Sequence, residues 1–365
     1  MEHSTERRLF WARVMACAGA IAVSACVDSA FAQVGHRPLG TPDANGFYWT
    51  TVSGGANPAF YSDDFNTPFS NGRGSVSYDY RLSRLEISTA QWMEFYNAMG
   101  DTADVFTTIG LPPTFWGARV DSDYRGPGRQ YKLSSHPDAA NLPVGSLTWR
   151  QAALYCNWLH NGKPDDFADI ARGAYDTTTW GIDQDTGRYS DADTHEPGAK
   201  YWIPSLDEWM KGVYWDPRKS DNNGWWLQPG TKDDVLIAAP PDQGGETNAV
   251  FTLPNWGEME IPIGSYVDVQ SPWGLFDASG SSSEWLESWS PLGGVGEPQP
   301  YARMYMTSEA GGSAELFPWG WGGVSPTSAS GSRDSFRIAS LVPNVPAGAG
   351  LAIGASFFAI RRRRA

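Results

Sequence analysis

The chain has 365 residues, of which 41% are hydrophobic and 19% are charged, and this composition excludes a disordered chain and indicates a globular protein. The net charge of −14 argues against nucleic acid as a partner, because an acidic body repels phosphate backbones. The 18 Trp and 40 Gly residues, set among few charges, indicate a loop-rich fold held by aromatic side chains rather than by long helices.

The N-terminal segment has the features of an export signal. Three arginines precede an apolar stretch at residues 14–25, and Ala30-Phe31-Ala32 matches the A-x-A pattern of a cleavage site. We therefore predict a signal peptide at residues 1–32. The alternative is a bacterial lipobox at residues 23–26, which would place a lipid on Cys26. Cleavage after Ala32 is favoured, because a lipobox leaves the segment 27–32 without a role.

Three short helices are predicted in the body of the chain. Each begins with a capping box, in which a Ser or Thr is followed three residues later by Gln or Glu. The boxes begin at Ser88, Thr148 and Ser205, residues 78–87 alternate like a strand that leads into the first helix, and Gly162 fits the end of the second. The side chains expected to face inward are Trp92, Phe95, Tyr96 and Met99 in the first helix, Ala152, Cys156 and Leu159 in the second, and Trp209 and Val213 in the third.

Three cysteines occur in the chain. Cys17 and Cys26 lie in the predicted leader, so Cys156 is the one cysteine expected in the mature protein. Because Cys156 sits in a helical pattern, a small buried hydrophobe is the favoured interpretation. A reactive thiol is the alternative, since His160 lies one helical turn further on.

The residues alone identify no catalytic group. The segment that begins at Asp183 is rich in aspartate but departs from an EF-hand, because Arg188 stands at the sixth position and no Glu stands at the twelfth. We expect an acidic, hydrated loop there. The five histidines are scattered without a close-spaced pair, and neither a phosphate-binding glycine loop nor a G-x-S-x-G motif occurs.

The C-terminal end resembles a bacterial PEP-CTERM sorting tail. Residues 342–346 contain Pro-Asn-Val-Pro in place of Pro-Glu-Pro, and an apolar run at 347–360 is followed by four arginines at 361–364. A helix of roughly 14 residues would be about 21 Å long, shorter than a hydrocarbon core of about 30 Å. We predict that residues 342–365 are a membrane sorting tail whose arginines stay cytoplasmic, and that residues 41–340 form one domain.

Segments of that domain resemble the formylglycine-generating enzyme family, also called the sulfatase-modifying-factor family. Residues 274–285, Gly-Leu-Phe-Asp-Ala-Ser-Gly-Ser-Ser-Ser-Glu-Trp, are similar to its GLYDMxGNVWEW segment. In the same order as in the family, residues 204–209 resemble LPTEAEW, 311–313 resemble RGGSW and 336–339 resemble GFRVA. Residues 85–95, 143–152 and 155–159 resemble EVTNAQYAEF, PVVGVSWYDA and YCNWL. The resemblance implies an α+β fold that is irregular, loop-rich and C-type-lectin-like.

The resemblance also implies a site. In the family, a serine and a tryptophan line a peptide-binding pocket, and two loops hold structural calcium, an ion that prefers carbonyl and carboxylate oxygens. The residues implied here are Trp285, Gly311, Gly312 and Ser313 for the pocket, and Asn248, Ala249, Gly280, Ser282 and Glu284 for calcium. The first calcium loop departs from the family, because Ser281 and Ser283 replace an Asn and an aromatic residue.

Copper is not expected. Formylglycine-generating enzymes carry two copper-binding cysteines just after the pocket serine. This chain has Glu315, Leu316, Pro318 and Trp319 in that region and no cysteine. The resemblance therefore extends to the fold but not to the copper chemistry, and no catalytic residue is assigned.

Three functions remain open at this point. The favoured one is an exported, membrane-sorted, non-catalytic domain that binds a peptide, protein or glycan at the cell surface or outside the cell. The second is an active oxidase of the formylglycine-generating type, with a different metal arrangement or with Cys156 involved. The third is a carbohydrate-binding surface module of lectin type, suggested by the many tryptophans and acidic loops.

Overall fold

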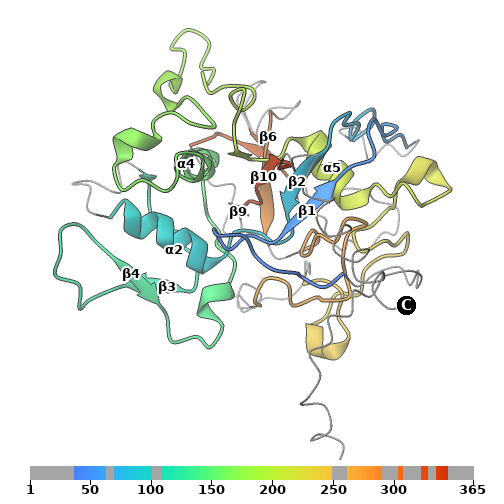
Figure 1. The fold of residues 1–365 in the computed structure, drawn as a ribbon, viewed down its shortest axis with the longest axis horizontal. Coiled ribbons are helices and arrows are strands. Elements are labelled where there is room, and N and C mark those ends of the chain that lie inside the picture. Colours follow the sequence, from blue (N-terminus) through green and yellow to red (C-terminus); the bar gives the residue numbers. More distant parts are fainter. Residues whose placement is uncertain are drawn as a thin grey trace, which may run out of the picture. The chain divides into compact units, whose positions relative to one another are not determined.

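Four short strands from distant parts of the chain form the central sheet of this computed structural model. The structure describes residues 37–62, 70–100, 109–248, 261–280, 282–289, 303–306, 322–327 and 334–343. The strands have the order β1-β2-β10-β5, and neighbouring strands are antiparallel (Figure 1). They are β1 (Trp49–Val52), β2 (Tyr80–Ser83), β10 (Ala339–Leu341) and β5 (Tyr201–Trp202). The last described strand therefore lies in the interior of the sheet, between β2 and β5.

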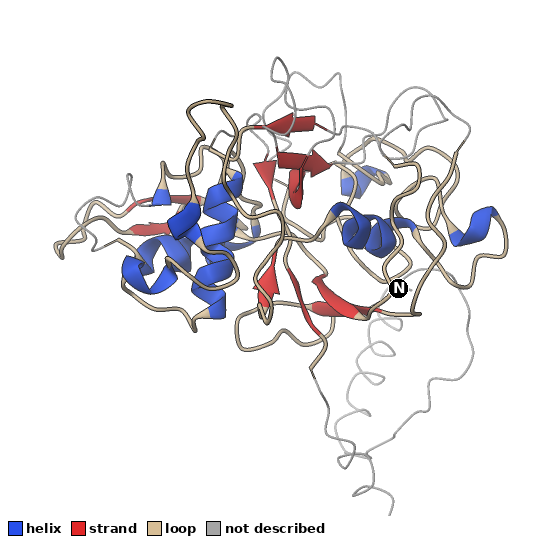
Figure 2. Cartoon of the chain, turned by 90° about the horizontal axis from the view of Figure 1, so that it is seen from above, coloured by secondary structure: helices blue, strands red, loops and turns tan. Residues whose placement is uncertain are grey.

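A second sheet is built around β6 (Ser283–Trp289), the longest of the described strands. Its order is β8-β7-β6-β9, in which β6 is antiparallel to β7 and parallel to β9. The partner strands are β7 (Arg303–Met306), β8 (Gly322–Val324) and β9 (Asp334–Ser335), and a separate hairpin joins β3 (Ala118–Val120) to β4 (Tyr131–Leu133). The helices lie on both sides of the strands (Figure 2).

The three predicted helices form where their capping boxes indicate. They are α2 (Thr89–Ala98), α4 (Trp149–His160) and α5 (Leu206–Tyr214). Ser88, Thr148 and Ser205 are their N-caps, and each capping box is complete. All nine side chains that were predicted to face inward are buried. Asn161 caps the end of α4, and Gly162 follows it with a φ of +83°, the left-handed conformation that often ends a helix.

The strand before α2 is shorter than the alternation at 78–87 predicts. It covers only Tyr80–Ser83, because the backbone changes partners after that point. The N–H of Arg84 donates to the carbonyl of Tyr48, and the N–H of Ile87 donates to that of Phe336. Residues after Ser83 therefore still run along the core, which explains the alternating pattern, but they no longer pair regularly with a neighbouring strand.

An aromatic cluster joins α2, α4 and the segment before β10. The ring of Trp92 lies 5.4 Å from that of Tyr155 and 6.0 Å from that of Phe336, centroid to centroid. Phe95 lies 5.4 Å from Trp158 in the same cluster. Buried aromatic rings contribute large apolar areas and favourable edge-to-face contacts, so a few residues hold together segments that the sequence keeps far apart.

Close contact between α5 and β2 depends on a glycine. A Cβ atom added to Gly212 would lie 2.4 Å from Cδ1 of Leu82. A side chain at this position would force the helix away from the sheet. The position therefore sets how near α5 comes to the central strands.

The described residues form a mixed α+β structure with small sheets, few helices and long loops, as predicted. The described loops contain five 3₁₀ turns, at Ala139–Asn141, Phe167–Ile170, Thr177–Thr179, Asn222–Gly224 and Pro241–Gln243. None of the described helices combines the length and the apolar character needed to span a bilayer. The predicted signal peptide at 1–32, and the predicted tail beyond Pro343, lie outside the described residues.

Candidate functional site

Strand β6 carries two acidic side chains into separate polar networks. Because successive side chains of a strand point to opposite faces, Glu284 and Leu286 share one face, and Trp285 and Glu287 share the other. Glu284 and Glu287 are 1% and 3% exposed. Buried carboxylates are stable only with hydrogen-bonding or charged partners, so each of them identifies a built polar cluster.

Glu284 forms a buried ion pair with Arg337. Nε and Nη2 of Arg337 donate to the two carboxylate oxygens, and Nε1 of Trp209 donates to Oε2 at 2.9 Å. Nη2 of Arg337 also donates to the carbonyl of Phe276 at 3.1 Å. Burial alone would lower the pKa of the guanidinium, but the adjacent carboxylate outweighs it and raises that pKa overall.

This ion pair bears on the calcium that the resemblance implies. Both oxygens of Glu284 are engaged, so a cation there would compete with a buried guanidinium. Ser282 is buried and donates to Glu86, and Asn248 is also buried, whereas Ala249 lies outside the described residues. Within the part of the chain that the structure describes, no group of three or more His, Cys, Asp or Glu side chains is placed to hold a metal. Calcium at these loops remains a prediction.

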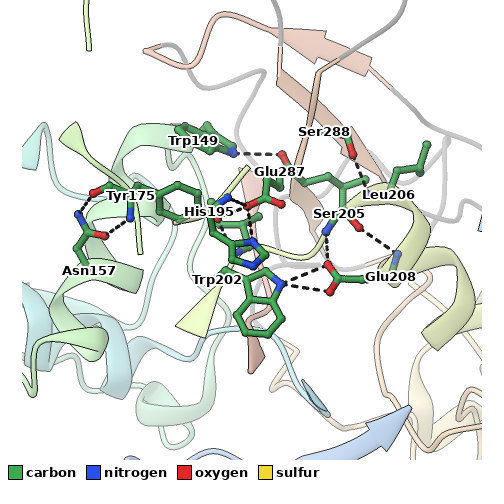
Figure 3. A network of polar contacts seen from close by, with 12 residues as sticks. Trp149, Asn157, Tyr175, His195, Trp202, Ser205, Leu206, Glu208, Glu287 and Ser288 are labelled. Atoms are coloured by element: carbon green, nitrogen blue, oxygen red, sulfur yellow. Dashed lines mark hydrogen bonds and ion pairs between the residues drawn. The ribbon is translucent and has the colours of Figure 1, made fainter. Parts of the chain in front are cut away.

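Glu287, on the other face of β6, fixes the loop that carries His195. Its Oε1 accepts from the backbone N–H of His195 at 2.6 Å and lies 2.9 Å from the imidazole Nδ1 (Figure 3). The hydroxyl of Tyr175 donates to the same oxygen at 3.0 Å. Tyr175 is itself held by Asn157 of α4, whose Oδ1 accepts its backbone N–H. The network therefore ties α4, the 175–195 loops and β6 together.

The ring of His195 is oriented by stacking as well as by hydrogen bonding. It lies flat on Trp202 of β5, with centroids 4.5 Å apart and planes 19° apart. Burial lowers the pKa of the imidazole, but the hydrogen bond and the charge of Glu287 raise it overall. The side chain is 26% exposed, so this oriented, readily protonated ring remains within reach of a ligand or of water.

Glu208 extends the network to the start of α5. Its Oε2 accepts the backbone N–H of Ser205 at 2.8 Å, and both of its oxygens lie 3.3 Å from Nε1 of Trp202 (Figure 3). The hydroxyl of Tyr78 donates to Oε1 at 3.0 Å. Burial is the main cause that raises the pKa of this carboxyl, and the charge of Glu287 adds to it. Glu208 therefore belongs both to the capping box that was predicted from the sequence and to a polar network that the sequence did not indicate.

Of the four predicted pocket residues, Trp285 alone lies within the described part of the chain. Trp285 is fully buried, and its Nε1 donates to the carbonyl of Leu147 at 2.9 Å. Its ring therefore forms part of the core between β6 and the start of α4. The other predicted pocket residues, Gly311, Gly312 and Ser313, lie outside the described residues, so the pocket remains a prediction.

Cys156 occupies the core, as the favoured interpretation holds. It is fully buried, and burial raises the pKa of its thiol well above the ordinary value. The imidazole of His160, the base that a reactive thiol would need, instead accepts the backbone N–H of Lys200 at 3.1 Å. A neutral, inaccessible thiol is a poor nucleophile and a poor metal ligand.

His195 and Glu287 were not singled out from the sequence, because the two residues are 92 positions apart.

The acidic loop at Asp183 is exposed, as predicted, and Oδ1 of Asp183 accepts two backbone N–H groups of its own turn. The indole of Trp289, a half-buried residue at the end of β6, donates to the exposed Asp193 at 2.9 Å. Imidazole, indole and carboxylate groups are therefore clustered beside the last residues of β6.

Comparison with known proteins identifies a family. The model of the sulfatase-modifying factor enzyme 1-like domain matches residues 51–314. Among curated proteins, none matches this sequence significantly.

Solved structures offer distant likenesses. CarF and the Treponema denticola variable protein 1 each have a TM-score of 0.47 and 17% identity, and the matches cover 81% and 84% of this chain and 99% and 98% of theirs. PvdO from Pseudomonas aeruginosa has a TM-score of 0.39 and 12% identity, over 84% of this chain and 99% of its own.

Proposed function

This chain belongs to the sulfatase-modifying factor enzyme 1-like family, and we propose that it is a non-catalytic member, exported and sorted to the membrane. In this proposal the domain binds a peptide or protein partner at the cell surface. The leader-like segment at 1–32 and the tail-like segment at 342–365 support export and membrane sorting.

The position of Cys156 carries the proposal. The family's oxidases, as the resemblance implies, hold copper with two cysteines, and this chain has only three cysteines in all. Two of them precede the predicted cleavage site, and the third is buried in α4 with a raised thiol pKa. With cleavage after Ala32, the mature chain would keep a single buried cysteine and no thiolate pair for copper, which supports a non-catalytic role.

The loop face beside β6 is the proposed binding surface. Two observations support it: His195 is oriented yet partly exposed, and the half-buried Trp289 contacts the exposed Asp193 at the end of β6. Aromatic and amphipathic side chains of this kind are enriched at the centres of protein interfaces.

Mass spectrometry tests the absence of catalysis. The purified protein is incubated with a cysteine-containing sulfatase peptide, copper and oxygen, and the peptide mass is followed. We expect no conversion of the cysteine to formylglycine, and conversion would overturn the proposal in favour of an oxidase. A Cys156→Ser variant then shows whether the buried thiol took part.

Arrays test the partner class. Labelled protein is applied to peptide and glycan arrays, with and without a chelator. Binding to peptides is the expected result. Binding confined to glycans, and lost with the chelator, would instead indicate a lectin-type module.

A further inference from the structure

The β3–β4 hairpin is a basic element of an acidic protein. Residues 118–133 contain four basic and two acidic side chains, a net charge of +2, whereas the whole chain has a net charge of −14. The basic residues are Arg119, Arg125, Arg129 and Lys132, and the three arginines are exposed. Because physiological salt screens exposed charges over about 8 Å, an anion that approaches the hairpin responds mainly to this local positive charge.

The register of the hairpin places two like charges side by side. Arg119 of β3 lies directly opposite Lys132 of β4, so both side chains stand on the same face. Like charges in directly opposed positions destabilise an antiparallel pair. Asp121 and Asp123 both pair with Lys132, at 2.6 and 2.9 Å. Stability alone would favour an acidic residue opposite the lysine, so an arginine at position 119 points to a role in binding.

The face that carries Arg119 is turned away from the core. On the other face Tyr131 is buried, and its ring lies 5.0 Å from that of Trp116 and 5.7 Å from that of Tyr96 in α2, centroid to centroid. Figure 1 shows the hairpin beside α2, as a two-stranded sheet separate from the two larger sheets. Since side chains alternate along a strand, Arg119 and Lys132 point away from α2.

Arg125 is held by one nitrogen of its guanidinium group. In the loop that connects the two strands, its Nη1 donates to the carbonyls of Ser122 and Tyr124 at 2.6 and 2.9 Å. No described residue accepts from its Nε or Nη2. These two nitrogens have the fork geometry with which arginine forms bidentate pairs with carboxylates.

We propose that the hairpin binds a short acidic peptide segment of a partner protein, whose carboxylates pair with the guanidinium groups of Arg119 and Arg125. A short segment fits better than a long anionic polymer or a bilayer. Either of those would extend beyond the hairpin over the rest of the chain, whose net charge is −16 once the +2 of the hairpin is subtracted from −14. The inference does not rest on the loop face beside β6, because none of these residues belongs to that face.

Fluorescence anisotropy tests the binding. The probe is a short fluorescein-labelled peptide of alternating Glu and Gly, and the control is a peptide of the same length in which Gln replaces Glu. We expect a saturable rise in anisotropy with the Glu peptide alone. Raising NaCl from about 0.1 to 0.5 M should weaken this binding by roughly tenfold, because the pairs form at an exposed surface.

Two double variants locate the surface. Arg119→Gln combined with Arg125→Gln should weaken binding by about 5- to 20-fold. Arg172→Gln combined with Arg188→Gln removes the same charge from exposed positions outside the hairpin. This matched control should change the affinity by less than about twofold.

Arg119→Glu separates binding from folding. It turns the like-charge pair with Lys132 into a pair of opposite charges, so the Tm should stay the same or rise slightly. Binding of the Glu peptide should nevertheless be lost. If the arginine had no role beyond the surface of the hairpin, the Tm would respond in the same way but the affinity would not fall.

Three results would overturn the inference. One is a loss of affinity as large in the control variant as in the hairpin variant, which would indicate unspecific attraction. Another is an Arg119→Glu variant that still binds the Glu peptide. The third is the absence of binding to the Glu peptide, including the case in which heparin or phosphatidylserine vesicles bind instead.

Discussion

Oε1 of Glu287 lies 2.9 Å from Nδ1 of His195 and also accepts the backbone N–H of the same residue at 2.6 Å. One carboxylate oxygen thus fixes both the main chain and the ring of a loop residue against the edge of β6. Burial opposes protonation of this ring, but Glu287 more than offsets that effect and raises the pKa of the imidazole. The pair therefore holds the 190–200 loop against the strand, and the strength of this contact depends on whether the imidazole of His195 is protonated.

Replacing His195 by Phe should cost stability mainly at low pH. Phe can keep the stack on Trp202 but loses the contact with Glu287. Because the pKa of His195 is raised in the folded state, its stabilising contribution is complete below the unfolded value of about 6.5 and is lost as the pH rises through the folded value. We expect a deficit of about 1 kcal/mol at pH 5.5 that shrinks by pH 9, measured by urea unfolding. His136→Phe is the control, and a deficit independent of pH would contradict the assignment.

Asp277→Asn should stabilise the protein at neutral pH. Burial raises the pKa of Asp277 to about 6, so the folded state binds this proton more tightly than the unfolded state does. Stability from this group is therefore lost as the pH rises from about 4 through 6, by up to about 3 kcal/mol. Asn can still accept the N–H of Gly264, and it tolerates the φ of +53° at this position. Chemical unfolding should show a gain at pH 7.5 that vanishes near pH 4, and equal gains at both values would contradict the prediction.

Breaking the Glu284–Arg337 pair should be far more damaging than breaking an exposed pair. Glu284→Gln leaves a fully buried guanidinium without its carboxylate, a change that typically costs 3–5 kcal/mol. Glu94→Gln, which removes the partner of Lys163 at the surface, should cost less than about 1 kcal/mol. Thermal unfolding of the two variants compares them directly, and similar losses would show that Arg337 finds other partners.

The thiol of Cys156 should react only when the protein unfolds. The side chain is fully buried and its thiol pKa is raised, so both access and thiolate formation are prevented. Ellman's reagent should label a Cys17→Ser, Cys26→Ser variant very slowly in buffer and rapidly in guanidinium chloride. Fast labelling of the folded protein would reopen the hypothesis of a reactive thiol.

Two truncations that differ by three residues should behave in opposite ways. Removal of residues 342–365 leaves β10 whole, because this strand ends at Leu341. We expect an unchanged Tm and release of the protein from the membrane fraction. Removal of residues 339–365 deletes a strand that pairs with both β2 and β5, and the domain should not fold. A large loss of Tm in the shorter deletion would show that the tail belongs to the fold.

The sequence determined the local features of this protein. The helix starts at Ser88, Thr148 and Ser205 were predicted because a capping box involves residues only three positions apart. The burial of Cys156 followed from helical spacing in the same way. The fold followed from a series of motifs in the family's order, which the family match over residues 51–314 confirms.

Only the tertiary structure decided which partner each buried charge has. Glu284, which the resemblance assigns to a calcium loop, pairs with Arg337, 53 residues further along the chain. The capping residue Glu208 also serves Tyr78, 130 residues away, and Glu287 meets His195 across 92 residues. Such contacts leave no periodic trace in the sequence, because they depend on how separate elements pack and not on the spacing within any one of them.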